Sequence, residues 1–236
     1  MAYLEPSPKH VRVEVAGTMV ADSRRPHLLH QPGMPAAWWF PCEDVRMELF
    51  DGAGRREPHP LFGSIELFDL RTAGRHEAGF AHRHPDAAAL RGLVGLDWRR
   101  VDRVYEEDEP VAAEPLDPYH RIDVRDSSRR LRISLDDVHL AASDRPRMLF
   151  ETTARTRFYL RADEVETELL EPSTLRTSCQ YKGLAEYFHV RVGDRLAENL
   201  VWRYLDPRED GRRIAGRFCI HHERCHTEVD GQPWHR

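Results

Sequence analysis

The chain has 236 residues, of which 32% are charged and 40% hydrophobic, and its formal net charge is −5. These values are typical of a folded globular protein and exclude a disordered chain. Because there is no basic excess, nucleic acid is not an expected partner. No apolar run has the length of a signal peptide or a membrane span, so we expect a cytoplasmic protein that does not contact membranes.

The first half predicts short β-strands. Val11, Val13 and Val15 alternate with polar residues, the period of a strand with one buried face, and residues 16–18 read as a hairpin turn before a second short strand. PAAWWFP (residues 35–41) is an aromatic-rich strand ahead of an acidic turn. ALRGLVGL (residues 89–96) taken alone fits a helix as well as a strand.

Residues 107–121 contain three prolines and few apolar residues, the composition of an extended linker. We therefore expect a first domain over residues 1–112, a proline-rich linker over 113–120 and a second domain over 121–236.

The second half predicts the same series of strands. Leu131, Ile133 and Leu135 alternate with polar residues, and a turn at 136–138 leads to another short strand. TARTRFYL (residues 153–160) is again aromatic-rich and followed by an acidic turn. RIAGRFCIHH (residues 213–222) favours a strand, and its counterpart at 89–96 is therefore predicted as a strand too.

Comparison of the chain with itself reveals a repeat. Three blocks recur in the same order: VADSRRP (20–26) as LAASDRP (140–146), LFGSIELF (61–68) as YKGLAEYF (181–188), and LRGLVGLDWRR (90–100) as IAGRFCIHHER (214–224). The first two pairs share an offset of 120 residues. We therefore predict an all-β protein of two tandem small domains of antiparallel strands with few short helices.

These blocks resemble a known family. VADSRR (20–25), FPCEDV (40–45) and WRRVDRVYEEDEP (98–110) in the first half, with TSCQYKG (177–183), WRYLDP (202–207) and IAG (214–216) in the second, are similar to domain of unknown function (DUF) family 427, which is catalogued as nucleotidyltransferase-like. The resemblance implies two β-tent domains and no defined activity. Relatives with that fold bind small molecules, peptides or nucleic acid ends, and many hold zinc through C-x-x-C pairs, which this chain lacks.

The resemblance also implies where the site lies. The family's thiol and lysine positions are Cys179 and Lys182 in the second half but His59 and Phe62 in the first, so we expect a degenerate first copy and a site-bearing second copy. Only Lys9 and Lys182 are lysines among the 35 basic residues. Lys182 is a compact cation for an anionic ligand, or a nucleophile or base if its pKa is lowered.

Cys179 is either a reactive thiolate or a small core residue. On a straight strand residues three apart face opposite ways, so Cys179 and Lys182 converge only if the chain turns between them.

CIHHERCH (residues 219–226) is dense in zinc-ligand types. On a strand Cys219 and His221 share one face and His222 lies on the other, and the spacing between Cys219 and Cys225 is not that of a C-x-x-C knuckle. We predict no metal and no cofactor, while binding of a metal by Cys219, His221, His222, Cys225 and His226 stays open.

Further candidate ligand-binding residues are aromatic or come from the repeated turn. Trp202 and Tyr204 share a strand face, and aromatic planes suit a flat ligand; Arg145 has an equivalent in Arg25 and a guanidinium suits an anion. The full set of candidate ligand-binding residues is Arg25, Trp39, Ser143, Arg145, Tyr181, Trp202 and Tyr204.

We expect a small-molecule-binding module, with an anionic or nucleotide-like ligand in the second domain or between the domains. The alternatives are an enzyme in which Cys179 or Lys182 performs covalent or general-base chemistry, and a protein-interaction scaffold. Whether a reaction is catalysed stays open, as does the oligomeric state, for which a monomer is compatible with the sequence.

Overall fold

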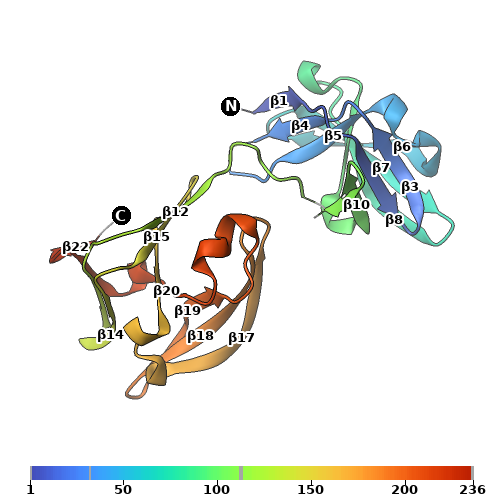
Figure 1. Cartoon of the computed structure of the whole chain (residues 1–236). Coiled ribbons are helices and arrows are strands. Elements are labelled where there is room, and N and C mark those ends of the chain that lie inside the picture. The colour runs from blue at the N-terminus through green and yellow to red at the C-terminus, as the bar shows by residue number, and fades with distance from the viewer. Residues whose placement is uncertain (1, 32, 112–113, 235–236) are drawn as a thin grey trace. The chain divides into compact units, whose positions relative to one another are not determined.

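The chain forms two compact units, Met1–Asp117 and Pro118–Arg236, each described by itself (Figure 1). The structure, a computed structural model, describes residues 2–31, 33–111 and 114–234, the side chains of 52–54 excepted. The division between the units falls within the segment predicted as the linker. Residues 112 and 113, where the first domain was predicted to end, lie outside the described residues.

The first unit contains two antiparallel sheets and short 3-10 helices. Its seven-stranded sheet has the spatial order β1 (Tyr3–Pro6), β4 (His27–His30), β5 (Ala37–Pro41), β9 (Leu93–Leu96), β8 (Arg75–Arg83), β7 (Gly63–Thr72) and β6 (Phe50–His59). Its four-stranded sheet has the order β11 (Glu109–Val111), β10 (Arg103–Glu106), β2 (Val11–Val15) and β3 (Thr18–Ser23). The 3-10 helices are η1 (Cys42–Asp44), η2 (Met47–Leu49), η3 (Ala88–Leu90) and η4 (Trp98–Arg100).

The second unit repeats this topology strand for strand. Its seven-stranded sheet has the order β12 (Ile122–Asp126), β15 (Arg147–Glu151), β16 (Arg157–Leu160), β20 (Phe218–Ile220), β19 (Arg195–Tyr204), β18 (Gly183–Val192) and β17 (Leu170–Cys179). Its four-stranded sheet, given in the same direction as that of the first unit, has the order β22 (Gln232–Pro233), β21 (His226–Val229), β13 (Leu131–Leu135) and β14 (Val138–Ser143). The 3-10 helices are η5 (Ala162–Glu164), η6 (Thr167–Leu169), η7 (Glu209–Ile214) and η8 (His222–Arg224).

The predicted fold class, mainly β with sheets in two tandem halves, is confirmed. The segment 89–96, ambiguous by itself, contains strand β9 at Leu93–Leu96 after the short helix η3. None of the described helices is long and apolar enough to cross a membrane.

Irregularities of the sheets recur at the same offset as the sequence blocks. The pairing of β2 with β3 shifts register between Val13 and Glu14, and that of β13 with β14 shifts between Ile133 and Ser134. The bulge between Phe68 and Leu70 in β7 likewise recurs between Phe188 and Val190 in β18. Since a bulge is a specific local feature and not a general property of sheets, its recurrence supports duplication of one ancestral unit.

The hairpin turns of the four-stranded sheets follow from left-handed backbone conformations. Ala16 and Gly17 have φ of 49° and 70°, and Asp136 and Asp137 have φ of 49° and 63°. Two successive residues with positive φ are the requirement of the type I′ turn, whose twist matches that of the flanking strands. The turns predicted at 16–18 and 136–138 are confirmed.

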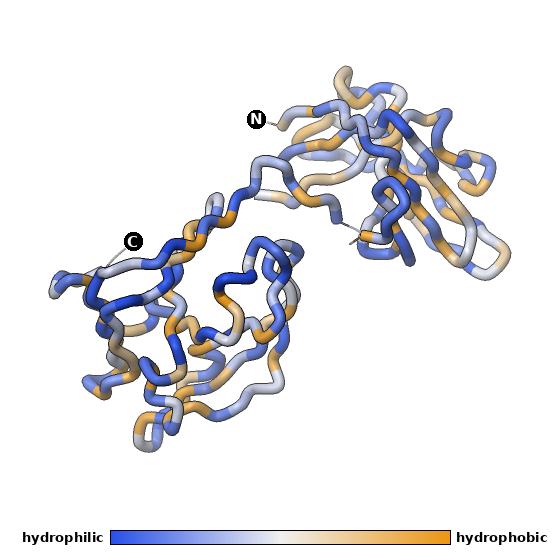
Figure 2. Tube along the Cα trace, in the orientation of Figure 1, coloured by the Kyte–Doolittle hydropathy of each residue, from blue (hydrophilic) through white to orange (hydrophobic). Residues whose placement is uncertain are grey.

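Each seven-stranded sheet is buried on both faces at its centre. In β16, Phe158 and Leu160 pack into the main core between the two sheets, while Tyr159 between them enters a second apolar cluster on the opposite face. In β20, Cys219 joins that second cluster. Figure 2 shows mixed apolar and polar colouring along the strands of both units. The candidate site, described in the next subsection, lies beside this second apolar cluster.

We expect Gly183→Ala to destabilise the second unit. Gly183 has φ of +92°, and although a Cβ there would meet its nearest atoms at an ordinary 3.5 Å, that conformation strains any L-residue. The expected loss is about 1–3 kcal/mol of unfolding free energy, measured by urea denaturation. Gly74→Ala, at a turn without positive φ and with open space around it, is the control and should change stability little. Equal stabilities of the two variants would contradict the strain at Gly183.

Candidate functional site

Lys182 lies at the tip of the hairpin between β17 and β18. Cys179 and Gly183 are cross-strand partners, so Gln180, Tyr181 and Lys182 form a three-residue loop. Such loops close through a residue in the left-handed region, here Gly183. The chain therefore does turn between Cys179 and Lys182, as their convergence requires.

The Lys182 amine forms an ion pair with Glu151 at the end of β15. Lys182 is only 8% exposed, and its Nζ contacts Glu151 Oε2. The other carboxylate oxygen, Oε1, lies 3.1 Å from His120 Nε2. The hairpin tip is thus linked through one carboxylate to the segment that precedes β12.

His120 also stacks on Tyr181. The ring centroids are 3.9 Å apart and the planes are inclined by 18°. Tyr181 is buried. His120, Glu151, Tyr181 and Lys182, called the Lys182 cluster below, therefore combine two paired charges with a stacked pair of rings.

The segment that follows β19 covers the hairpin tip. The Arg208 backbone N–H donates to the Lys182 carbonyl at 3.2 Å, and its Nη1 donates to the Gln180 carbonyl at 2.8 Å. A Cβ on Gly211 would lie 3.1 Å from Pro207 Cβ and 3.6 Å from Lys182 Cα. Glycine at this position thus lets η7 approach the tip closely (Figure 1).

The floor of this region is apolar and neutral. Tyr159, Trp202, Tyr204 and Cys219 are all buried in the second apolar cluster. Burial raises the pKa of Tyr159, and burial followed by the nearby Cys179 and Tyr187 raises the pKa of Tyr204. Burial also raises the pKa of Cys219, so this thiol stays protonated and unreactive. Cys179 differs because it is a half-buried free thiol at the end of β17.

Trp202 and Tyr204 do share a strand face, as predicted, and Trp202 is held from several sides. Its ring is 4.4 Å from that of His221, and the Arg157 guanidinium lies 5.1 Å from its centroid. Arg157 also donates to both oxygens of Glu223, at 2.6 and 3.0 Å. Although burial opposes ionisation, these bonds lower the pKa of Glu223 to about 2. Trp202 is therefore a fixed wall of the second apolar cluster.

The segment of residues 219–226 is divided between two faces, as the alternation predicted. Cys219 and His221 lie on the side of Trp202. His222 instead lies edge-on to Phe158 of the main core, at 5.6 Å, and Cys225 packs against that core. Among residues 2–31, 33–111 and 114–234, no three His, Cys, Asp or Glu side chains are grouped so that they could hold a metal.

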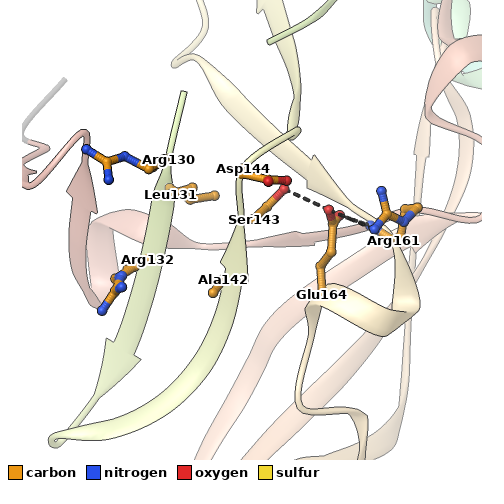
Figure 3. Close-up of a pocket in the computed structure, with 8 residues that line it drawn as sticks. All are labelled: Arg130, Leu131, Arg132, Ala142, Ser143, Asp144, Arg161 and Glu164. Carbon is orange, nitrogen blue, oxygen red and sulfur yellow. Dashed lines mark hydrogen bonds and ion pairs between the residues drawn. The ribbon is translucent and has the colours of Figure 1, made fainter. Parts of the chain in front are cut away.

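Ser143 ends β14 of the four-stranded sheet, and Arg145 lies in the bend between β14 and β15. Ser143 Oγ donates to Glu164 at 2.8 Å and accepts the Arg145 backbone N–H at 3.0 Å, which ties β14 to η5. Ser143 lines an open hollow of about 330 Å³ with Arg130, Arg132 and Arg161 among its walls (Figure 3). The Arg145 guanidinium is exposed and lies 3.4 Å from Asp144.

The first unit repeats the serine arrangement. Ser23 Oγ donates to Asp44 at 2.7 Å and accepts the Arg25 backbone N–H at 3.2 Å. The exposed Arg25 guanidinium pairs with Glu43 at 2.6 Å. In both units the serine has a structural role and the arginine is a surface residue paired with a neighbouring carboxylate.

The first unit keeps the hairpin but fills it with rings. Phe62, at the position of Lys182, stacks on His59 with 5.1 Å between centroids and 15° between planes. Trp39, predicted as a ligand-binding residue, is 3% exposed and packs against His82 and His84, with 5.0 and 5.4 Å between the ring centroids.

Two members of the Lys182 cluster, His120 and Glu151, were not predicted from the sequence. A signal for Glu151 is present in the repeat, because Gln31 stands at the same offset in the first half. The halves thus differ together at both ends of one ion pair, Lys182 for Phe62 and Glu151 for Gln31. His120 precedes the second copy within the segment predicted as a linker, where no pattern marks a site residue.

Comparison with known proteins identifies the family of both units. A search of curated proteins finds no match. The family described as "Domain of unknown function (DUF427)", with the catalogue name NTP_transf_9, matches residues 3–107 and again residues 123–231. Because the two matches cover most of the chain and coincide with the two repeated sets of sheets, the protein belongs to the DUF427 family as a tandem pair.

Proposed function

We propose that the protein is a small-molecule-binding module and that its second unit binds the ligand at the Lys182 cluster. The supporting observation is that the first unit has the same sheets and the same hairpin with Phe62 and Gln31 in place of Lys182 and Glu151. The fold therefore does not need this ion pair. Because burying an ion pair costs desolvation energy that its attraction offsets only in part, a role other than folding accounts best for it.

The chemistry of the cluster favours an anionic ligand with a flat group. A carboxylate or phosphate oxygen would compete with Glu151 for the Lys182 ammonium, and Arg208 at the covering segment adds a second cation. The stacked rings of His120 and Tyr181 offer a plane beside these charges. A nucleotide-like molecule combines both features.

The second candidate function is catalysis by Cys179. The half-buried free thiol lies one hairpin turn from Lys182, which is the observation in its favour. The Lys182 amine, however, is engaged by a carboxylate, an arrangement that suits a charge partner better than an amine nucleophile. Binding is therefore the preferred function. Cytoplasmic location, the absence of nucleic-acid partners and a monomeric state stay predictions of the sequence.

Replacement of Lys182 should weaken ligand binding while the protein still folds. The experiment is a thermal-shift screen of the full chain against anionic metabolites and nucleotides, in which a ligand that binds only the folded state raises the melting temperature. For any ligand that raises the melting temperature, Lys182→Met should weaken binding by about tenfold to a hundredfold, which corresponds to the loss of one hydrogen bond to a charged group.

Lys9→Met is the matched control, since Lys9 is the other lysine and pairs with Glu106 on the surface of the first unit. Trp202→Ala should also reduce the ligand-induced rise in melting temperature, because it removes a large side chain of the second apolar cluster. A ligand whose affinity is unchanged in Lys182→Met would remove this residue from the site.

Alkylation separates binding from covalent catalysis. Under the binding proposal, iodoacetamide should modify Cys179 no faster than it modifies a cysteine in a denatured chain, and Cys179→Ala should keep the ligand's thermal shift. Cys219, fully buried, is the internal control and should stay unmodified while the protein is folded. Rapid modification of Cys179 at neutral pH, read by mass spectrometry of the peptides, would instead support the enzyme.

A further inference from the structure

The first unit contains a hollow of its own. Its volume is about 510 Å³, within the range of small-molecule sites. The small residues Ala36, Ala37 and Gly79 leave space, and Leu67, Leu96 and Trp98 supply apolar area. Because all its walls come from the first unit, the hollow is independent of the Lys182 cluster.

A histidine lines this hollow without using its hydrogen-bonding groups. The ring centroid of His82 lies 5.0 Å from that of Trp39, edge-on, and 5.6 Å from that of His84. Among the described residues, neither ring nitrogen of His82 has a hydrogen-bond partner. Burial, and the neighbouring His84 after it, lower the pKa of His82 to about 4. The imidazole is therefore neutral at pH 7 and offers one donor and one acceptor.

Gly95 makes room for this imidazole. A Cβ on Gly95 would lie 2.5 Å from His82 Nε2 and 2.9 Å from His82 Cε1, distances that real Cβ atoms essentially never show. The second unit has Trp202 at the position of His82 and Cys219 at the position of Gly95. The pairing of an imidazole with a glycine thus distinguishes the first unit.

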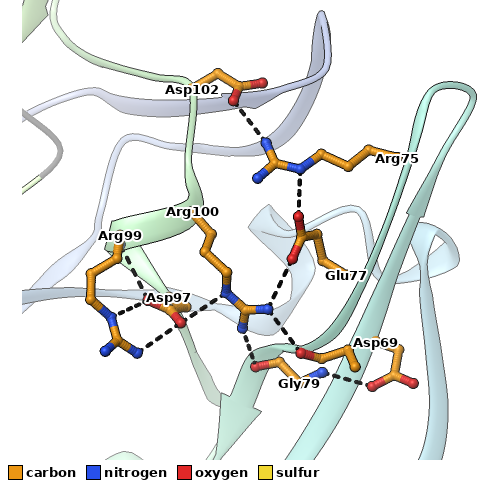
Figure 4. A network of polar contacts seen from close by, with 9 residues as sticks. Asp69, Arg75, Glu77, Gly79, Asp97, Arg99, Arg100 and Asp102 are labelled. Atoms are coloured by element: carbon orange, nitrogen blue, oxygen red, sulfur yellow. Dashed lines mark hydrogen bonds and ion pairs between the residues drawn. The ribbon is translucent and has the colours of Figure 1, made fainter.

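The charges beside the hollow are already satisfied within the protein. Asp97 accepts hydrogen bonds from Arg99 Nε and Nη2, each at 3.0 Å, and from Arg100 Nε at 2.9 Å (Figure 4). Arg100 then donates to Glu77 at 3.1 Å and to the Gly79 carbonyl at 2.8 Å. This network holds the wall formed by η4 and β8.

At the mouth of the hollow, Arg99 and Glu114 are exposed, and a charge there contributes little to affinity. The described lining residues therefore present apolar surface, the neutral imidazole of His82 and the Gln31 side-chain amide, and among them no charge lacks a partner or exposure to solvent.

We propose that this hollow is a second ligand-binding site, specific for an uncharged, flat heteroaromatic molecule that forms a hydrogen bond with His82 and packs against Trp98. The volume suits a bicyclic ring system, and the indole and leucine side chains suit its faces. Among the described residues of the interior, an anion would find no free cation and a cation would find no free carboxylate. The site extends the function proposed above, because it lies in the other unit and selects the opposite kind of ligand.

The test uses the isotope-labelled full chain and four neutral bicyclic probes: quinolin-2-one, benzimidazol-2-one, indazole and 7-azaindole. At millimolar concentration at least one should shift the NMR signals of the His82 imidazole and the Trp98 indole N–H. Quinoline-2-carboxylate, of similar shape but charged, should bind about tenfold more weakly or not at all. If no neutral probe shifts these two side chains, or if the carboxylate binds as well as they do, the proposal is overturned.

Variants then locate the binding. His82→Phe keeps a ring and removes both nitrogens. It should weaken the affinity for the probe by up to about tenfold, which corresponds to the loss of one hydrogen bond. Ala37→Leu, which keeps His82 and fills the space, should block the probe and covers the case in which His82→Phe does not fold. Lys182→Met should leave probe binding unchanged, so failure of this site and failure of the second unit's site are read separately. Undiminished binding in folded Ala37→Leu would place the probe elsewhere.

Discussion

The structure of each unit depends on one constraint, the burial of the seven-stranded sheet on both of its faces. Consecutive residues of its central strands face opposite ways, so Phe158 and Leu160 enter the main core while Tyr159 enters the second cluster. One face packs against the four-stranded sheet. The other needs its own cover, which the hairpin tip and the segment around η7 provide in the second unit. Both candidate sites lie where strands of this sheet meet such covering segments.

Duplication of this architecture makes the protein an internal comparison. The two units have the same strand order, and two of their bulges recur at an offset of 120 residues, so differences between equivalent side chains occur on nearly the same backbone. In the second unit Lys182 and Glu151 place paired charges at the hairpin tip, where the first unit has Phe62 and Gln31. In the first unit the His82 imidazole lines a hollow and packs over Gly95, where the second has Trp202 and Cys219. A few substitutions thus separate two chemically unlike surfaces.

Much of the fold could be predicted from the sequence because its signals are local or repeated. The alternation of Val11, Val13 and Val15 reports one buried face, and alignment of the two halves resolved the ambiguous segment that became β9. The candidate site was predictable only in part. Lys182 was noticed as a rare residue beside a glycine, whereas Glu151 and His120 reach it from distant positions, and no spacing rule connects residues 31 or more apart in sequence.

The prediction of one site from Ser143, Arg145 and Lys182 combined residues of different elements: Ser143 ends β14, Arg145 lies in the bend after it, and Lys182 lies in the loop between β17 and β18. Sequence order does not reveal which strand ends meet in space. The hollow beside His82 was not predicted for a related reason. It depends on a missing Cβ at Gly95 and on an imidazole that has no hydrogen-bond partner among the described residues, and neither absence has a sequence pattern.

The hairpin tip of the second unit is held by its main chain. The Arg208 amide bonds the carbonyl of Lys182 and the Arg208 side chain bonds that of Gln180, so these bonds use no atom of the Lys182 side chain. Evolution can therefore exchange the residue at the tip, and with it the chemistry presented there, while the loop keeps its shape. The two copies in this chain already differ in this way, with Phe62 in one loop and Lys182 in the other.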